Sequence, residues 1–200
     1  MEWDDVRGYG RLPAELLRTD FFDEYRAKDM TDMGRQLVER RLALLRQYVS
    51  SGDEVIDVGI GGGAFVTACS GARGLDVDPK AIGWLKERKL QATLADDPKA
   101  MTFWDSFEHI ADPHALLRAY KPGYVVMSIP LFSGKESALV SKHYKPGEHI
   151  WYFTFHGLLD YMDSYRCVHV SKMEELLGRE EISTLVFADP DEAMRLRCLT

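Results

Sequence analysis

The residues best suited to chemistry lie in one short segment, Val55–Phe65, in which glycines follow an apolar run that ends in an acid. The glycines stand at positions 59, 61, 62 and 63. Because glycine lacks a Cβ atom, backbone amides in such a turn can approach a ligand closely. A turn that opens a helix also directs free N–H groups and the positive end of the helix dipole at the ligand. The segment therefore predicts a strand, a tight turn and a site for a nucleotide-like cofactor.

Two carboxylates accompany this turn. Asp57 stands two positions before Gly59 and gives the pattern Asp-x-Gly-x-Gly-x-Gly, and Asp76 comes 19 residues later, at the expected tip of the next strand. A carboxylate there can accept hydrogen bonds from both hydroxyls of a ribose, as it does in NAD-binding proteins. The spacing Gly59-x-Gly61-x-x-Ala64 also satisfies the dinucleotide fingerprint, which is a weak match on its own. The acids predict a ribose and leave the choice of cofactor open.

Two later segments bear on that choice. With its glycine motif, the chain resembles the class I S-adenosylmethionine-dependent methyltransferases of the small-molecule type (methyltransferase type 11/23-like domains). Residues 103–113, Phe-Trp-Asp-Ser-Phe-Glu-His-Ile-Ala-Asp-Pro, resemble the segment after their fourth strand, where an acid and a histidine precede Ile/Val-x-Asp-Pro. Residues 121–130 resemble their fifth strand, which is entered through a Pro-Gly turn. The resemblance covers roughly residues 35–190 and favours S-adenosylmethionine over NAD.

The resemblance implies which residues contact S-adenosylmethionine. The methionyl end and the ribose are surrounded by Asp57, Gly59, Ile60, Gly61, Gly63, Asp76 and Val77. The adenine is contacted by Asp96, and the floor of the cleft is formed by Asp105, Phe107 and His109. Several of these have structural alternatives: the glycines can form an ordinary tight turn, and Asp57 can cap that turn. Asp96 can belong to a solvated turn before Pro98, Phe107 can be a core aromatic, and His109 can bond only to backbone.

A helix is predicted at about 33–49, where Leu37, Leu45 and other apolar residues cover one arc at about 100° per residue. Arg41 lies near the middle of that apolar arc, and a cation there needs a partner. One hypothesis is that Arg41 extends past its neighbours or pairs with a core acid. The other, which the family resemblance implies, is that it binds the carboxylate of the cofactor's methionyl group.

The segment 141–154 is the predicted acceptor side, because it follows the fifth strand at the edge where open α/β sheets bind ligands. Its histidines, His143 and His149, are the predicted catalytic bases for an acceptor that must lose a proton. The alternative is that the segment is simply a packed loop. No metal site is predicted, since these two histidines lack a third ligand at a supporting spacing.

The pattern of apolar runs and turn residues predicts strands at 54–58, 72–76, 91–95, 100–104, 123–129, 166–171 and 182–188. Helices are predicted at 64–70, 79–88, 112–119 and 154–163, short helical pieces within 1–30, and a loop over 131–150. Strands alternating with helices give an α/β fold with a doubly wound, mostly parallel sheet. The resemblance implies seven strands with an antiparallel C-terminal strand. We expect one domain, with an N-terminal helical cap (1–50), a cofactor-binding half (51–130), and an acceptor loop with closing strands (131–200).

Composition narrows the class of protein. The chain has 200 residues, is 46% hydrophobic and has a net charge of −7. The negative charge makes nucleic acid an unexpected partner. There is no run of about 18 apolar residues, so we expect no membrane span. The acidic N-terminus and three widely spaced cysteines favour a reducing cytoplasm over secretion and predict neither a disulfide framework nor a zinc site.

These observations favour one function over two others. The main hypothesis is transfer of a methyl group from S-adenosylmethionine to a small-molecule acceptor. The alternatives are an NAD-dependent oxidoreductase and a non-catalytic module that binds S-adenosylmethionine. The Asp/Asn-Pro-Pro-aromatic signature of amino-group DNA methyltransferases is absent after the fourth predicted strand. The sequence defines neither the acceptor nor the oligomeric state.

Overall fold

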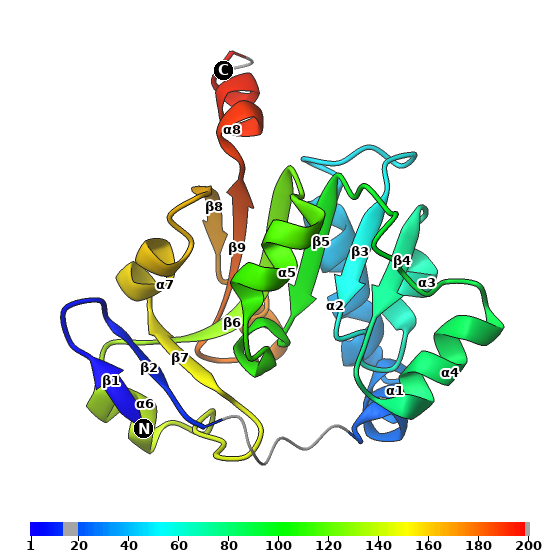
Figure 1. The fold of residues 1–200 in the computed structure, drawn as a ribbon. Helices are drawn as coiled ribbons and strands as arrows, with labels where there is room; N and C mark the ends of the chain where they lie inside the picture. Colours follow the sequence, from blue (N-terminus) through cyan, green and yellow to red (C-terminus); the bar gives the residue numbers. More distant parts are fainter. Residues whose placement is uncertain (14–19, 199–200) are drawn as a thin grey trace. The chain divides into compact units, whose positions relative to one another are not determined.

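The structure is a computed structural model that describes residues 1–13 and 20–198. The described chain forms two compact units. We call residues 20–104 and 114–126 the glycine-turn unit, and residues 1–13, 105–113 and 127–198 the histidine unit. Figure 1 shows the elements of both units and their labels.

The glycine-turn unit is built on parallel strands in the order β5-β3-β4: β3 (Val55–Val58) pairs with both β4 (Ala72–Leu75) and β5 (Ala100–Trp104). Every residue of β3 and β5 is buried, as expected for a parallel sheet covered on both faces. Helix α2 (Asp32–Leu45) lies behind these strands and α5 (Pro113–Tyr120) in front of them in Figure 1. The predicted doubly wound arrangement is therefore present in this unit.

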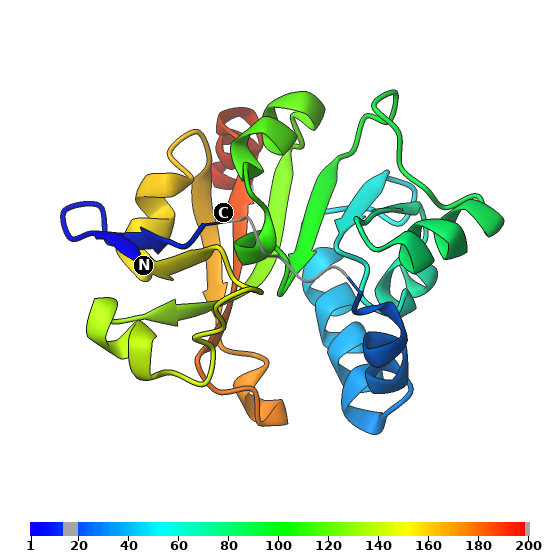
Figure 2. The same cartoon turned by 60° about the horizontal axis from the view of Figure 1, so that its bottom comes forward.

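The other helices of this unit are α1 (Phe22–Asp29), α3 (Ala64–Ala68) and α4 (Pro79–Glu87). Figure 2 shows α1 and α2 side by side. Helix α4 begins as predicted, with Pro79 in its first turn and the Asp78 carboxylate accepting the Lys80 amide at 2.8 Å.

The histidine unit contains an antiparallel hairpin, β1 (Glu2–Asp4) and β2 (Tyr9–Arg11), which continues through β7 (Trp151–Thr154) to β6. Strand β6 (Tyr124–Phe132) begins in the glycine-turn unit and continues in the histidine unit from Met127. Strand β9 (Ile182–Ala188) pairs with β6 and, antiparallel, with β8 (Arg166–Ser171). The remaining elements are α6 (Lys135–Val140), α7 (Phe155–Tyr161), α8 (Pro190–Arg197) and the 3₁₀ turns η1 (Phe107–His109) and η2 (Glu175–Leu177).

The predicted α/β class with a mostly parallel sheet is confirmed, but the described residues form a sheet of nine strands and not seven. Strands β8 and β9 have the predicted bounds and antiparallel pairing. Three local predictions are wrong. Residues 2–11 form a hairpin and not helical pieces, because Asp4 accepts the amides of Val6 and Arg7 at 3.0 Å and Gly8 has a left-handed φ of 73°. The described residues of the predicted helical cap therefore become helical only from α1 onward.

The strand predicted at 91–95 is reduced to an isolated bridge between Gly74 and Gln91. The Asp96 carboxylate accepts the Thr93 amide at 2.5 Å, and this local turn competes with strand pairing. The segment 131–150 is not all loop, since it contains α6. Ser137 stabilises the start of α6, where its hydroxyl accepts the amides of Ser133 and Gly134 at 2.9 and 3.1 Å. Within the described part of the chain, no helix has the length and apolar character that a membrane span requires.

Candidate cofactor site and histidine cluster

The turn between β3 and α3 has the backbone that its glycines predict. Gly59, Gly61 and Gly63 have left-handed φ values of 72°, 55° and 88°, a conformation that L-residues with a side chain rarely adopt. At Gly63 an added Cβ would also lie 2.6 Å from the ring of Trp84. Both backbone conformation and packing therefore require glycine at position 63.

Helix α1, one of the short helical pieces predicted within residues 1–30, packs directly over this turn. A Cβ added at Gly62 would collide with the Arg26 backbone, whose nitrogen lies 2.6 Å away, and with the Asp29 carboxylate. The same carboxylate accepts the Ala64 amide at the start of α3 at 3.2 Å. The expectation that the free amides at this helix start point at a ligand is therefore wrong for Ala64, because Asp29 binds that amide.

Asp76 connects the end of β4 to the glycine turn. One carboxylate oxygen accepts the Ile60 amide at 2.9 Å, and the other accepts the amides of Val77 and Asp78 at 2.8 Å. Burial raises the pKa of this carboxyl, and the three amide hydrogen bonds oppose that rise. A carboxylate has about four acceptor positions, so Asp76 keeps capacity for a further donor.

Asp57 is almost fully buried in β3, with 1% of its surface exposed. Its carboxylate accepts the hydroxyl of Thr102, on the neighbouring strand β5, at 2.7 Å. Burial raises its pKa to about 7, against the opposing effects of the Thr102 hydrogen bond and the positive charge of Arg41. Asp57 is therefore a carboxyl whose ionisation depends strongly on nearby cations.

Arg41 has the partners that its place on the apolar arc of α2 requires. Its guanidinium lies over the ring of Trp104, 4.8 Å from the ring centroid. Burial raises the pKa of both Asp57 and Asp29, and the charge of Arg41 opposes that rise. These interactions match the hypothesis of a cation held among core groups, and they place its charge beside the glycine turn.

Two further residues of this unit that were predicted to contact the cofactor, Val77 and Asp96, differ from each other in environment. Val77 is 74% exposed, which is unusual for a branched apolar side chain next to a buried acid. Asp96 caps its own turn through Thr93 and lies 3.6 Å from the Nε of Arg73. The contacts of Asp96 thus match the structural alternative considered for it.

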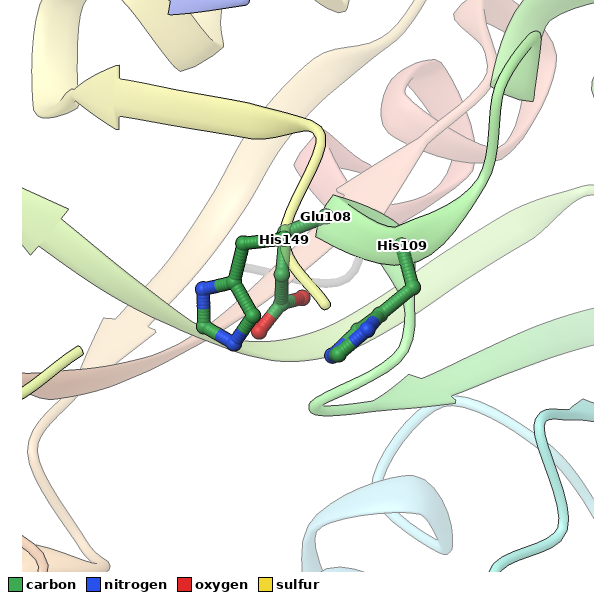
Figure 3. Close-up of side chains that lie close together, drawn as sticks. All are labelled: Glu108, His109 and His149. Carbon is green, nitrogen blue, oxygen red and sulfur yellow. The ribbon is translucent and has the colours of Figure 1, made fainter. Parts of the chain in front are cut away.

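In the histidine unit, η1 and the segment before β7 bring three chemically active side chains together. The Ile150 amide donates to the Glu108 carbonyl and the Trp151 indole donates to the Ile110 carbonyl, both at 2.8 Å. These bonds hold the two segments side by side. As a result, the rings of His109 and His149 meet at a centroid separation of 4.6 Å, with the Glu108 carboxylate beside them (Figure 3).

Burial dominates the electrostatics of this group, which we call the histidine cluster (Glu108, His109 and His149). It raises the pKa of Glu108 to about 8, with the nearby charge of Asp105 as the next cause. It lowers the pKa of His149 to about 2 and also lowers that of His109. Both imidazoles are therefore neutral at neutral pH, and each keeps a nitrogen lone pair.

Asp105 and Phe107 are held by contacts that spacing did not reveal. Both carboxylate oxygens of Asp105 accept from Arg179 at 2.8 Å, and Arg179 also donates to the buried Glu174 at 2.6 Å. Asp105 has a left-handed φ of 55°, which is uncommon for a residue with a side chain. Phe107 is fully buried, and its packing matches the structural alternative of a core aromatic.

The other histidine predicted as a base, His143, is not a member of the cluster. It is partly exposed, its Nε2 is 3.2 Å from the Glu180 carbonyl, and burial lowers its pKa. Since a carbonyl oxygen only accepts, Nε2 must carry the proton and Nδ1 the lone pair. The structure therefore separates the environments of His143 and His149.

Comparison with known proteins identifies the family. A family model described as "Methyltransferase domain" matches residues 22–170, and the search of curated protein sequences found no match. The fold is similar to that of a putative methyltransferase of Haloferax volcanii, solved with the Trm112 methyltransferase activator (18% identity, 85% of this chain and 96% of that chain, TM-score 0.59).

Two further structures are similar. A SAM-dependent methyltransferase of Archaeoglobus fulgidus is 18% identical over 85% of this chain and 100% of that chain, with a TM-score of 0.57. The N-methyltransferase NodS of Bradyrhizobium japonicum, solved with S-adenosyl-L-homocysteine, is 16% identical over 86% and 99%, with a TM-score of 0.53. The chain therefore belongs to the methyltransferase domain family, which confirms both the class I resemblance and the predicted enzyme class, an S-adenosylmethionine-dependent methyltransferase.

Proposed function

We propose that this protein transfers a methyl group from S-adenosylmethionine to a small-molecule acceptor, with the glycine-turn unit holding the cofactor. The observation that carries this proposal is the placement of Asp57 and Asp76 at the ends of adjacent parallel strands, on either side of a turn with three left-handed glycines. Ligands of open α/β sheets bind beyond the carboxyl ends of such strands. Within the family shown by the sequence match, that position belongs to the methyl donor.

The residues at this edge fit the chemistry of the cofactor. The one remaining acceptor position of Asp76 suits a single ribose hydroxyl. The exposed Val77 side chain offers an apolar surface to the adenine ring. An ammonium group near Asp57 would favour its ionised form and lower its pKa from about 7, so we assign Asp57 to the amino group of the methionyl end.

When bound, the cofactor supplies an activated methyl group on a positively charged sulfur. The protein then needs mainly to align the acceptor and exclude water, and positioning can provide most of the rate. Two structurally similar proteins support a small acceptor: a magnesium protoporphyrin IX methyltransferase and a possible histamine N-methyltransferase. The net charge of −7 also supports this class over a nucleic acid.

For an acceptor that must lose a proton, we assign the role of base to His143 and not to His149. With a pKa of about 2, the buried His149 is too weak a base to hold a proton near neutral pH. His143 is more exposed, and the Glu180 carbonyl leaves its Nδ1 free to accept.

Calorimetric titration of the protein with S-adenosylhomocysteine and, separately, with NAD tests the proposal. We expect saturable binding of S-adenosylhomocysteine only. Asp76→Asn should weaken this binding by about tenfold or more, because a hydrogen bond to a charged group contributes roughly 1.5–3 kcal/mol. Glu87→Gln is the matched control, since it neutralises an exposed carboxylate of the same unit at the end of α4.

Equal binding by the wild type and Asp76→Asn would contradict the assignment of the ribose site, and binding of NAD alone would contradict the function. Once binding is established, incubation with labelled methyl donor and a metabolite extract should label a small compound. Label found only in macromolecules would contradict the proposed acceptor class.

A further inference from the structure

The histidine cluster has the composition of a metal site that the sequence spacing did not reveal. Glu108 and His109 come from η1, and His149 comes from the segment just before β7. Each offers one ligand atom, and these atoms all lie within 4.8 Å of one another. Figure 3 shows the three side chains pointing toward one another. We propose that Glu108, His109 and His149 bind a divalent transition-metal ion of the zinc type.

The burial of unsatisfied polar atoms points to a missing partner in the cluster. Glu108 and His149 are only 1% and 4% exposed. Yet Glu108 Oε2 and His149 Nδ1 have no hydrogen-bond partner within residues 1–13 and 20–198. Leaving a buried polar group unpaired is costly, and such atoms in a folded protein call for an explanation. A bound cation would satisfy the carboxylate and the ring nitrogen together.

Among the residues that the structure describes, the charges around Glu108 do not supply this cation. Arg179, whose charge acts on Glu108, is bound to Asp105 and Glu174. Lys145 lies 3.5 Å from a carboxylate oxygen of Glu148. Both cations thus have their own acidic partners, while the Glu108 oxygen remains without a hydrogen bond.

The ligand types select the class of ion. Two imidazoles and one carboxylate suit zinc and its neighbours in the first transition series, whereas magnesium and calcium prefer oxygen ligands. Ligand atoms around a tetrahedral zinc are roughly 3.3 Å apart, so modest side-chain rotations would close the observed spacing. Three protein ligands leave a coordination position for water or for an oxygen atom of an acceptor.

One ligand already has the outer support typical of metal-binding histidines. The His109 ring hydrogen-bonds to the backbone of Glu148, the residue just before His149. Such a bond to the second ring nitrogen fixes the tautomer and the direction of the first. The same short segment therefore supplies one ligand and orients another.

A competing explanation needs no ion. Glu108 could remain protonated beside two neutral imidazoles, and the cluster would then be a buried polar contact. The two explanations differ in metal binding. A protonated Glu108 gives no specific site, whereas a metal site binds one ion per chain and depends on all three side chains.

The experiment is calorimetric titration of chelator-treated, full-length protein with zinc chloride. We expect one ion per chain for the wild type. Glu108→Gln, which is nearly isosteric, and His149→Ala should each weaken zinc binding by at least about tenfold. His156→Gln is the matched control: it removes an exposed imidazole of the same unit and should change the affinity by no more than about twofold.

X-ray absorption of the zinc-loaded wild type provides a measurement that does not depend on variant folding. It should show nitrogen and oxygen neighbours at about 2.0–2.2 Å and no sulfur. Stoichiometry well below one ion, a sulfur neighbour, or equal losses in His149→Ala and His156→Gln would overturn the proposal. Because zinc binding is measured without methyl donor, the result is independent of the proposed methyl transfer.

Discussion

Asp57 combines a negative charge with nearly complete burial, and this conflict makes it the most pH-sensitive residue of the glycine-turn unit that we can identify. The Thr102 hydroxyl and the charge of Arg41 favour its ionised form, against the larger effect of burial. Its pKa is therefore about 7 in the folded protein, against 3.8 for an unperturbed carboxyl. Between these values the folded protein binds a proton that the unfolded chain does not.

The free energy of unfolding should consequently fall as the pH rises from about 4 to about 7, and the contribution of Asp57 should be constant above that. The total loss in the free energy of unfolding from Asp57 over this pH range is at most about 4 kcal/mol. Asp57→Asn keeps an acceptor for Thr102 and removes the charge. Relative to the wild type, this variant should become more stable as the pH rises through this range, in urea unfolding without ligand.

Other buried carboxyls also titrate, so the quantity to follow is the difference in the free energy of unfolding between Asp57→Asn and the wild type. A difference that stays constant from pH 4.5 to 7.5 would contradict the raised pKa. The same variant should bind S-adenosylhomocysteine more weakly, because it loses the charge assigned to the cofactor's amino group. Gain in stability with loss of binding is the usual pattern for strained functional residues.

At the scale of residues, the sequence predicted what depends on local spacing. The tight glycine turn, the acid before it and the start of α4 at Pro79 follow from short patterns. Asp29, Thr102 and Arg179 were not predicted, because their partners are 35, 45 and 74 positions away. The histidine cluster was missed for the same reason, since His149 lies 40 positions beyond His109 and shares no motif with it.

At the scale of elements, the contact between α1 and the glycine turn determines what residue 62 can be. Gly62 has no left-handed φ, so its need for glycine comes from the close approach of Arg26 and Asp29 alone. Gly83 is a useful contrast, because it lies inside α4 and an added Cβ there meets no atom within 4 Å.

Gly62→Ala should destabilise the protein by about 1–3 kcal/mol, the usual effect of overpacking a tight contact. Gly83→Ala should stabilise it by about 0.5–1 kcal/mol, because alanine loses less entropy than glycine in a helix. Thermal or urea unfolding of both variants measures the two effects. Unchanged or increased stability of Gly62→Ala would show that α1 does not constrain the turn.

The elements themselves were predicted where one local pattern dominated. Strands β3, β5, β8 and β9 are continuous apolar or alternating runs, and tertiary structure did not alter them. At 91–95 a local turn held by Asp96 formed in place of the predicted strand. The hairpin at residues 2–11 depends on pairing with the distant β7. Such competition between local turns and remote pairing cannot be resolved from a short window.

At the scale of the whole molecule, the two proposed sites belong to different units. The residues assigned to the ribose and methionyl groups lie in 20–104, and the histidine cluster lies in 105–113 and 127–198. The sequence predicted the three-part order of cap, cofactor half and closing strands, but not that residues 1–13 and 105–113 would join the C-terminal strands in one unit. Strand pairing between chain segments distant in sequence produces that grouping.

Hydrogen exchange with and without S-adenosylhomocysteine tests the assignment of the cofactor to the glycine-turn unit. Among amides that exchange by local opening, the largest gain in protection should fall on peptides covering 55–64 and 74–80. Ile60 and Val77, which donate to the proposed ribose ligand Asp76, lie on the proposed binding edge within these peptides. Strands β8 and β9 should change least at short exchange times. NAD at the same concentration is the control and should protect neither region. A largest gain within 141–154 would instead assign the cofactor to the histidine unit, and the roles given to Asp57 and Asp76 would then be wrong.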